Sequence, residues 1–310
     1  MVSEKSVRTK PFYKTILFRW LIGGLGVLLV LVYVSVSVYG AITLTTSTTH
    51  NAQDLEPNTP TMPYENVTFK TSDKAQLTMR GWWIPRENSR RVLIMVHAKD
   101  GTRTFLLPVS QRLWQEGFNI LLYDTRGQGQ SEGDHYSFGW YEKYDVVGAV
   151  NFVKSKGFQP SSIGAVGWSM GAATTLLAMA ETPDIKAGLA ESSFGNLDRV
   201  FQGQFSSNTG LPDFFYPGIR AAAGLLFGFE VLQTNPEKVF PKLGDRKVFL
   251  IHGEKDQVVP VSEFYRLIEA GGANVAENWL VPSTEHVRSF QNYPDEYIKR
   301  AVAFFNRELS

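Results

Sequence analysis

The pattern of hydrophobic and polar positions divides the chain into three parts. Residues 20–42 carry no charged side chain and consist mainly of Leu, Val, Ile and Gly. Residues 43–63 are rich in Thr, Asn and Pro and show no periodicity, which is typical of a solvated linker. From residue 64 to the C terminus, short apolar runs alternate with amphipathic stretches. The pattern therefore predicts one apolar helix, a polar linker and a globular domain.

The alternation within the globular part predicts an α/β fold. Residues 66–71 and 76–84 read as an antiparallel pair of strands joined by a turn. Strands that alternate with helices imply a mostly parallel sheet with helices on both faces. The further predicted strands are residues 92–96, 119–123, 163–166, 187–190, 248–252 and 279–281, and the predicted helices are residues 106–116, 141–154 and 172–180.

The stretch with the clearest chemistry is residues 167–171, which read Gly-Trp-Ser-Met-Gly. A predicted strand leads into it and a predicted helix leads out, which is the context of a nucleophile elbow. Such a turn strains the backbone of the serine, and glycines on either side let neighbouring backbone approach without a clashing Cβ. Ser169 alone could be a helix-capping serine. In this context it is the predicted nucleophile.

A serine nucleophile needs a base and an acid, and the α/β-hydrolase order along the chain is Ser, then Asp or Glu, then His. Asp256 lies in the loop that leaves the predicted strand at 248–252, and His286 follows the strand at 279–281. Each residue alone would be read as a turn, a cap or a surface side chain. Together, in this order, they predict a catalytic triad. Glu191, at the end of the strand at 187–190, is the alternative acid.

These motifs resemble those of serine hydrolases of the α/β-hydrolase superfamily, closest in pattern to small members with one membrane anchor. The resemblance covers about residue 64 to the C terminus. Besides the elbow it includes residues 253–260, Gly-Glu-Lys-Asp-Gln-Val-Val-Pro, and residues 124–131, Asp-Thr-Arg-Gly-Gln-Gly-Gln-Ser. In the family the latter segment is mostly a structural turn beside the active site. The resemblance thus implies the α/β-hydrolase fold.

The resemblance also implies where an oxyanion hole would form. One backbone donor is the N–H of Met170, the residue after the nucleophile, and the other comes from the loop after the strand at 92–96. This loop reads His-Ala-Lys-Asp-Gly over residues 97–101, where relatives usually have His-Gly. The alanine leaves the second donor open, and Lys99 is the expected one. His97 is expected to brace the loop, with a role as catalytic base as the alternative.

Residues 194–242 interrupt the alternation and are unusually aromatic. They lie where relatives insert a lid, so they are interpreted as a lid-like insertion that forms an apolar wall beside Ser169. The alternative is that a helix at residues 219–227 simply packs onto the sheet.

The apolar segment at residues 20–42 is long enough to cross a bilayer, at about 1.5 Å per helical residue. Basic residues precede it, and the next Lys or Arg after it is Lys70. The positive-inside rule therefore predicts residues 1–19 as a cytoplasmic tail and an extracytoplasmic catalytic domain. A cleaved signal peptide is an alternative, although its apolar core is usually only about 7 to 15 residues. A buried core helix is the other alternative.

Composition narrows the function. The net charge of +1 argues against a nucleic-acid surface, and the absence of cysteine excludes disulfides and thiolate metal sites. The expected function is hydrolysis of a carboxylic ester or thioester through an acyl-enzyme, with no cofactor or metal and with a small-molecule or lipid-like acyl substrate. A peptidase or amidase of the same fold is one alternative. A catalytically silent binding member, favoured by Ala98, is the other.

Overall fold

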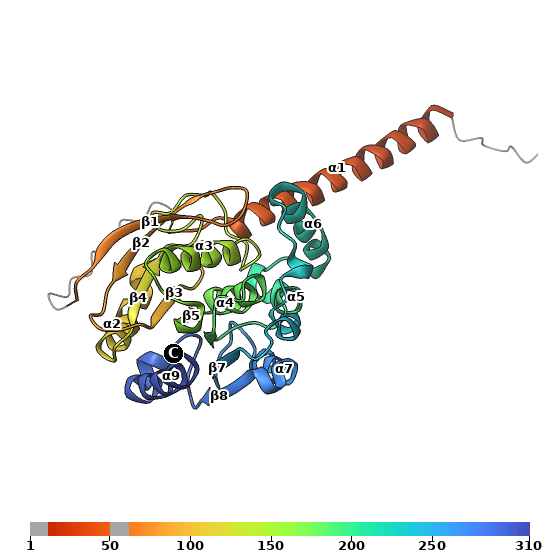
Figure 1. Cartoon of the computed structure of the whole chain (residues 1–310). Coiled ribbons are helices and arrows are strands. Elements are labelled where there is room, and N and C mark those ends of the chain that lie inside the picture. The colour runs from red at the N-terminus through yellow and green to blue at the C-terminus, as the bar shows by residue number, and fades with distance from the viewer. Residues whose placement is uncertain (1–11, 50–61) are drawn as a thin grey trace, which may run out of the picture.

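The computed structural model of the chain describes residues 12–49 and 62–310 (Figure 1). A long helix, α1 (Phe12–Thr45), extends away from a domain whose first strand begins at Glu65. Residues 1–11 of the predicted cytoplasmic tail and residues 50–61 of the predicted linker lie outside the described residues. Helix α1 contains a segment that is apolar and long enough to cross a membrane, Leu17–Thr45.

The domain is built on an eight-stranded sheet with the order β1-β2-β4-β3-β5-β6-β7-β8. Strands β1 and β2 are antiparallel, β2 is antiparallel to β4, and all the other neighbours pair in parallel. This confirms the predicted mostly parallel sheet. The strands are β1 (Glu65–Lys70), β2 (Thr78–Ile84), β3 (Val92–Val96), β4 (Asn119–Tyr123), β5 (Ile163–Trp168), β6 (Ala187–Glu191), β7 (Lys247–Gly253) and β8 (Val275–Val281).

Helices cover both faces of the sheet. On one face Val150 and Leu176 join a buried apolar cluster with the strands, and on the other face Val109 and Phe305 do so. Central parallel strands such as β3 and β5 are buried on both sides, which explains their continuous apolar runs. The first face carries α3 (Glu142–Ser155), α4 (Met170–Glu181) and α7 (Val261–Gly271), and the second carries α2 (Leu107–Gln115) and α9 (Pro294–Glu308), which the short α8 (Ser289–Asn292) precedes.

The insertion between β6 and β7 contains α5 (Leu197–Thr209) and α6 (Tyr216–Phe227), connected by the 3-10 turn η3 (Asp213–Phe215). Helix α6 lies along the C-terminal part of α1 (Figure 1). The alternative expectation that a helix at 219–227 packs onto the sheet is therefore wrong. Helix α6 packs on α1 because a small residue lets the two helices come close. A Cβ on Gly40 would come within 2.6 Å of the Ile219 side chain. A periodic pattern identifies a buried face but not the element that covers it.

The start of the predicted linker also differs from the structure. Residues 43–45 belong to α1, and the chain that leaves the helix is attached to the domain. Ser47 Oγ and the Thr48 N–H both donate to Asp100 Oδ1, at 3.2 and 3.0 Å. The Gly129 N–H donates to the Thr49 carbonyl oxygen at 3.1 Å. Thus the first described part of the linker is bound to the domain rather than surrounded by solvent.

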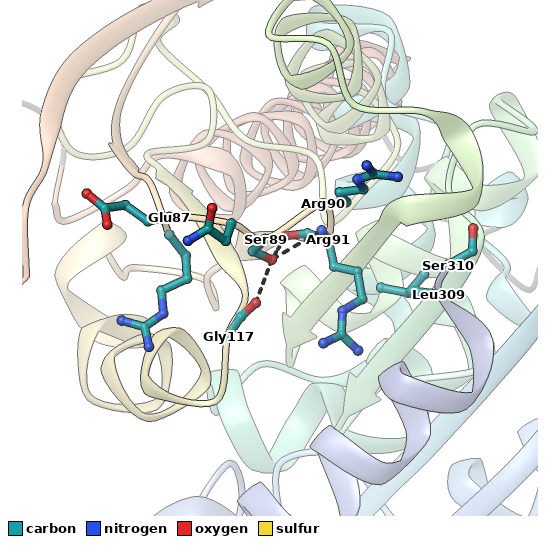
Figure 2. Close-up of a pocket in the computed structure, with 9 residues that line it drawn as sticks. Glu87, Ser89, Arg90, Arg91, Gly117, Leu309 and Ser310 are labelled. Atoms are coloured by element: carbon teal, nitrogen blue, oxygen red, sulfur yellow. Dashed lines mark hydrogen bonds between the residues drawn. The ribbon is translucent and has the colours of Figure 1, made fainter.

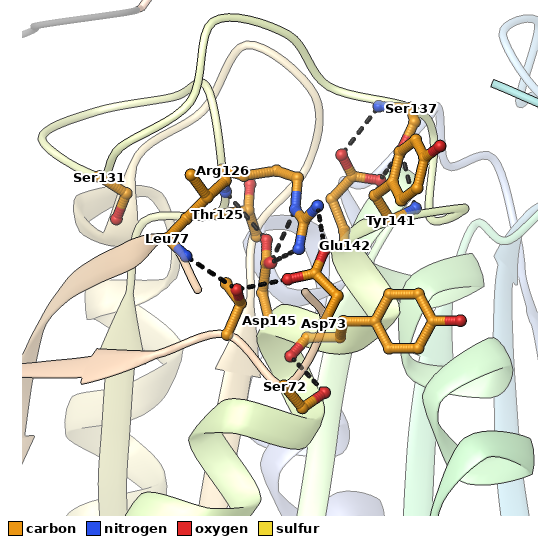
Figure 3. A network of polar contacts seen from close by, with 12 residues as sticks. Ser72, Asp73, Leu77, Thr125, Arg126, Ser131, Ser137, Tyr141, Glu142 and Asp145 are labelled. Carbon is orange, nitrogen blue, oxygen red and sulfur yellow. Dashed lines mark hydrogen bonds and ion pairs between the residues drawn. The ribbon is translucent and has the colours of Figure 1, made fainter. Parts of the chain in front are cut away.

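A polar network holds the turn after β4 (Figure 3). The Arg126 guanidinium donates to Asp145 Oδ1 through Nε and Nη2, at 2.8 and 2.6 Å, and to Asp73 Oδ2 through Nη1 at 2.9 Å. Glu142 in the same network accepts from the Ser137 hydroxyl and from the Gly139 N–H. Asp145 and Glu142 belong to α3, whereas Asp73 lies in the turn between β1 and β2. The contacts thus tie this loop to a helix and to another loop, in keeping with the structural role expected for residues 124–131.

Candidate active site

Ser169 lies at the sharp turn between β5 and α4. Its φ of +54° and ψ of −117° are strained for a residue with a Cβ, as the elbow predicts. The turn is tight because a Cβ on Gly167 would lie 2.1 Å from the Gly171 carbonyl oxygen, and one on Gly171 would lie 2.1 Å from the Val96 carbonyl oxygen. The Ser169 N–H donates to the Glu191 carbonyl oxygen at 2.8 Å. The backbone thus presents the hydroxyl at the carboxyl edge of the sheet.

The structure brings Ser169, His286 and Asp256 into one hydrogen-bonded chain. His286 Nε2 lies 2.8 Å from Ser169 Oγ, and His286 Nδ1 lies 2.7 Å from Asp256 Oδ2. Because a carboxylate only accepts, Nδ1 carries the proton, and Nε2 is left to accept the serine O–H. This is the tautomer that a general base needs. The three residues follow β5, β7 and β8, which lie in the same half of the sheet with β6 between β5 and β7 (Figure 1).

Asp256 is fixed from several sides. Its Oδ1 accepts the backbone N–H groups of Val258 and Val259 at 3.0 and 2.8 Å. Burial raises the pKa of Asp256, but the hydrogen bond and charge of His286 and the Val259 amide outweigh it, so the pKa lies below its usual value. The carboxyl is therefore held as an anion. His252, behind it, has a lowered pKa because it is buried, and it lies 3.5 Å from Asp256 Oδ2.

Glu191, the alternative acid, points to another part of the site. Its Oε1 accepts the Ser289 N–H at 3.0 Å, in the segment that follows His286. Burial raises the pKa of Glu191, and the contacts with Ser289 and Tyr297 only oppose this. Within the described residues, the carboxylate that accepts a hydrogen bond from His286 Nδ1 is that of Asp256. The geometry thus favours Asp256 as the partner of His286 and leaves Glu191 to hold the loop.

The first turn of α4 and the loop after β3 meet beside Ser169. Within the described part of the chain, the N–H groups of Met170, Ala98 and Lys99 have no protein acceptor. Amides without a partner at this position are suitable oxyanion donors. Met170 and Lys99 therefore remain the predicted pair, and the Ala98 amide is a further candidate. The Lys99 side chain turns away to an ion pair with Asp100 at 2.9 Å.

His97 is buried and braces this loop. Its Nδ1 lies 2.7 Å from the Ala98 carbonyl oxygen and its Nε2 accepts the Thr125 N–H at 3.0 Å. Both ring nitrogens are engaged with backbone, so His97 holds the loop and is not placed to serve as a base. The structure thus favours the first of the two readings of this residue.

Apolar residues extend from the site into the insertion. A buried cluster joins Met170 and Phe194 beside the nucleophile to Tyr216 and Ile219 of α6 and to Ala41 of α1. A solvent-open hollow of about 550 Å³ lies instead at the amino ends of β3 and β4, lined by residues 86–91 with Gly117, Leu309 and Ser310 (Figure 2). That hollow is on the edge of the sheet opposite Ser169. It takes no part in the candidate site.

The arrangement supports nucleophilic and acid–base chemistry. A neutral imidazole accepts the serine proton while a fixed carboxylate stabilises the resulting imidazolium. In the described part of the chain, no group of three or more His, Asp or Glu side chains is placed to hold a metal ion. The site thus holds a hydroxyl, an imidazole and a carboxylate hydrogen-bonded in series, with backbone amides next to them.

Sequence reasoning did not identify three supporting residues. The sequence pattern predicts Glu191 as a rival acid and Asp100 as part of a loop, and it gives His252 no role. Their roles depend on neighbours far away in the chain, such as Ser47 for Asp100 and Ser289 for Glu191. A carboxylate at the end of a fully apolar strand is a signal for Glu191, because a buried charge requires a partner.

Known proteins show the same architecture. The family profile of serine aminopeptidases, S33, matches residues 87–195. An esterase of Pyrococcus furiosus, Pf2001, superposes with a TM-score of 0.69 and 25% identity, covering 86% of this chain and 99% of that one. Protein YqkD of Bacillus subtilis is 27% identical over 245 residues, 78% of this chain and 80% of its own length. Protein YfhR of Escherichia coli K12 is 24% identical over 255 residues, 79% of this chain and 82% of its own.

The fold, the elbow and these similarities place the chain in the α/β-hydrolase superfamily. Within that superfamily they support a hydrolase of the esterase or peptidase type.

Proposed function

We propose that this chain is a serine hydrolase that cleaves a carboxylic ester or thioester through an acyl-enzyme. Ser169 Oγ attacks the substrate carbonyl carbon while His286 Nε2 takes the serine proton. The Met170 amide and an amide of the loop at residues 97–101 stabilise the oxyanion. His286 returns the proton to the leaving alcohol or thiol, and the acyl group stays on Ser169. Water, activated by His286, then releases the acid and restores the serine.

The observation that carries this proposal is the continuous hydrogen bonding from Ser169 Oγ to His286 and on to Asp256, at 2.8 and 2.7 Å. The strained φ of Ser169 supports it, because such backbone conformations in ordered turns cluster at functional sites. The name of the Pyrococcus furiosus neighbour, an esterase, supports ester chemistry.

A fluorophosphonate probe tests the proposal, because it reacts with an activated serine and not with an ordinary one. We expect the full chain to be labelled and Ser169→Ala to remain unlabelled. Ser193 is the control, since it is a serine that lies two residues after the end of β6 in the same sheet, and Ser193→Ala should label like the wild type. A wild-type chain that does not react would contradict the proposal and favour a silent binding member.

Peptide or amide hydrolysis is the second candidate, favoured by the match of residues 87–195 to the serine aminopeptidase profile. The triad is the same, and only the leaving group differs. Rates on matched pairs of acyl p-nitrophenyl esters and aminoacyl p-nitroanilides distinguish the two. A higher kcat/KM on the anilides than on the esters would replace the esterase assignment with the peptidase one.

We further propose that α1 anchors the enzyme in a membrane with the catalytic domain on the extracytoplasmic side. Residues 17–32 of the helix expose apolar side chains along its whole circumference, which suits a lipid environment. The basic residues before the apolar segment favour the cytoplasmic side for the N terminus. Carbonate extraction of membranes tests the anchoring, and protease accessibility of the domain in intact cells and in lysed cells tests the orientation. Release by carbonate would contradict the anchor.

A further inference from the structure

We infer that the tip of the insertion, η3 with its exposed Phe214, lies in the bilayer leaflet nearest the catalytic domain. This inference rests on the proposed membrane anchor. The partner of η3 would then be a lipid surface, in addition to any role of the insertion as a lid over Ser169.

The argument starts from the length of α1. Charged Arg19 precedes residues 20–32, the part of the helix in which every residue is exposed. This part measures roughly 20 Å at about 1.5 Å per residue. The hydrocarbon core of a bilayer is about 30 Å thick and requires about 20 residues. A span that begins at Trp20 therefore ends near Tyr39. Both aromatic residues are exposed, as interfacial anchors are.

The insertion packs against α1 inside that span. Tyr33 stacks on Phe215 and Phe214, with ring centroids 5.4 and 6.2 Å apart. A Cβ on Gly218 would come within 2.3 Å of Ser37 Oγ, so α6 is in direct contact one helical turn further along. Because Tyr33 lies six residues before Tyr39, its partners lie about 9 Å closer to the bilayer centre. The helix cannot span the membrane without bringing η3 into it.

The side chains at the tip suit this position. The Tyr33 hydroxyl donates to the Phe214 carbonyl oxygen at 3.2 Å, so that neither group needs water. Phe214 is 61% exposed although it is a large apolar side chain. Asp213 beside it is also exposed. The cost of placing its carboxylate in hydrocarbon opposes deep insertion, so the tip lies in the leaflet at a smaller depth than the helix length alone gives.

The consequence for the proposed hydrolase is the class of its substrate. The apolar cluster that includes Ala41, Tyr216 and Met170 continues from the membrane helix to the oxyanion-hole residue. With the tip in the leaflet, this cluster borders the acyl chains of the bilayer. The site is therefore placed to take an acyl lipid that stays partly in the membrane, and not only a dissolved ester.

Single cysteines test the position of the tip, because the chain has no cysteine of its own. Phe214→Cys is the test variant, and Leu29→Cys on the bare part of α1 and Tyr265→Cys on α7 are its controls. The three wild-type side chains are similarly exposed, at 61%, 61% and 55%. Each full-length variant is labelled with the fluorophore NBD in phosphatidylcholine vesicles and quenched with lipids doxyl-labelled on shallow or deep acyl carbons.

We expect NBD at Phe214→Cys to be quenched most by the shallow doxyl lipid, NBD at Leu29→Cys most by the deep one, and NBD at Tyr265→Cys by neither. Asp213→Cys repeats the test if Phe214→Cys fails to react with the fluorophosphonate probe. Quenching at Leu29→Cys without quenching at the tip would overturn the inference and leave the anchor in place. Absence of quenching at both positions would overturn the anchor as well, while labelling of Ser169 would still report on the hydrolase.

Discussion

The carboxyl edge of the sheet and the contact between α1 and α6 are held by different forces. At the edge, Ser169, His286 and Asp256 are oriented by short hydrogen bonds, and Glu191 fixes the adjoining loop through the Ser289 N–H. Between α1 and α6 the contacts are stacked rings and helix surfaces that meet at small residues. Directional bonds suit a site that must hold atoms in register, whereas close apolar packing suits a surface that borders lipid.

The largest expected loss of activity follows from replacing the proposed catalytic acid, Asp256. Asp256→Asn keeps the shape but lets His286 adopt the wrong tautomer, so we expect kcat for ester hydrolysis to fall by about 10⁴-fold. Glu191→Gln is the matched control and should lose far less, since its amide oxygen can still accept the Ser289 N–H. Steady-state kinetics on a p-nitrophenyl ester measure both. If Glu191→Gln suffers the larger loss, the acid is Glu191.

A change at Gly171 tests the oxyanion hole without replacing a residue of the triad. The added Cβ of Gly171→Ala would lie 2.1 Å from the Val96 carbonyl oxygen, which forces the first turn of α4 to move and displaces the Met170 amide. We expect kcat to fall about 10²- to 10³-fold, the usual effect of losing one donor. Gly203→Ala, where a Cβ meets no atom within 4 Å, should leave kcat unchanged. Equal activity of the two variants would remove Met170 from the proposed donors.

The packing of α6 on α1 is tested by a similar pair. Gly218→Ala places a Cβ 2.3 Å from Ser37 Oγ, so we expect the free energy of unfolding to fall by about 1–3 kcal/mol, as in other overpacked contacts. On the same helix a Cβ at Gly224 meets only the Phe229 carbonyl oxygen, at 3.9 Å. Gly224→Ala should raise the free energy by roughly 0.5–1 kcal/mol. Urea unfolding in micelles measures both, and a neutral Gly218→Ala would show that the contact is loose.

The smallest expected effect is the pH dependence of the free energy of unfolding that Asp256 causes. Because the pKa of Asp256 in the folded chain is below its ordinary value of 3.8, its ionised form stabilises the fold above that pH. This contribution is lost as the pH falls through the folded pKa. We therefore expect the difference in free energy of unfolding between wild type and Asp256→Asn to shrink from pH 7 to pH 3. A difference that grows over this range would mean that burial, which raises the pKa, prevails.

The carboxyl edge of the sheet was largely predictable from the sequence, whereas the contact between α1 and α6 was not. The strand at Val92–Val96 has the predicted bounds because a run buried on both faces is apolar throughout. The order of Ser169, Asp256 and His286 along the chain placed them after three strands of one sheet. The contact of Ile219 with Gly40, by contrast, joins segments far apart in the chain. From the sequence, the first segment could be covered by lipid and the second by the sheet. The local pattern predicts which face of a helix is buried, but tertiary packing decides which element covers that face.

In the proposed membrane arrangement, the hydrogen bonds from Ser47 and Thr48 to Asp100 would set the distance between the domain and the lipid. Helix α1 ends at Thr45, and two residues later the chain is bound to the loop that follows β3. The connection between a membrane-embedded α1 and the domain would therefore be short and fixed. The site would then work at one constant distance from the membrane, and its substrates would have to reach it along the membrane.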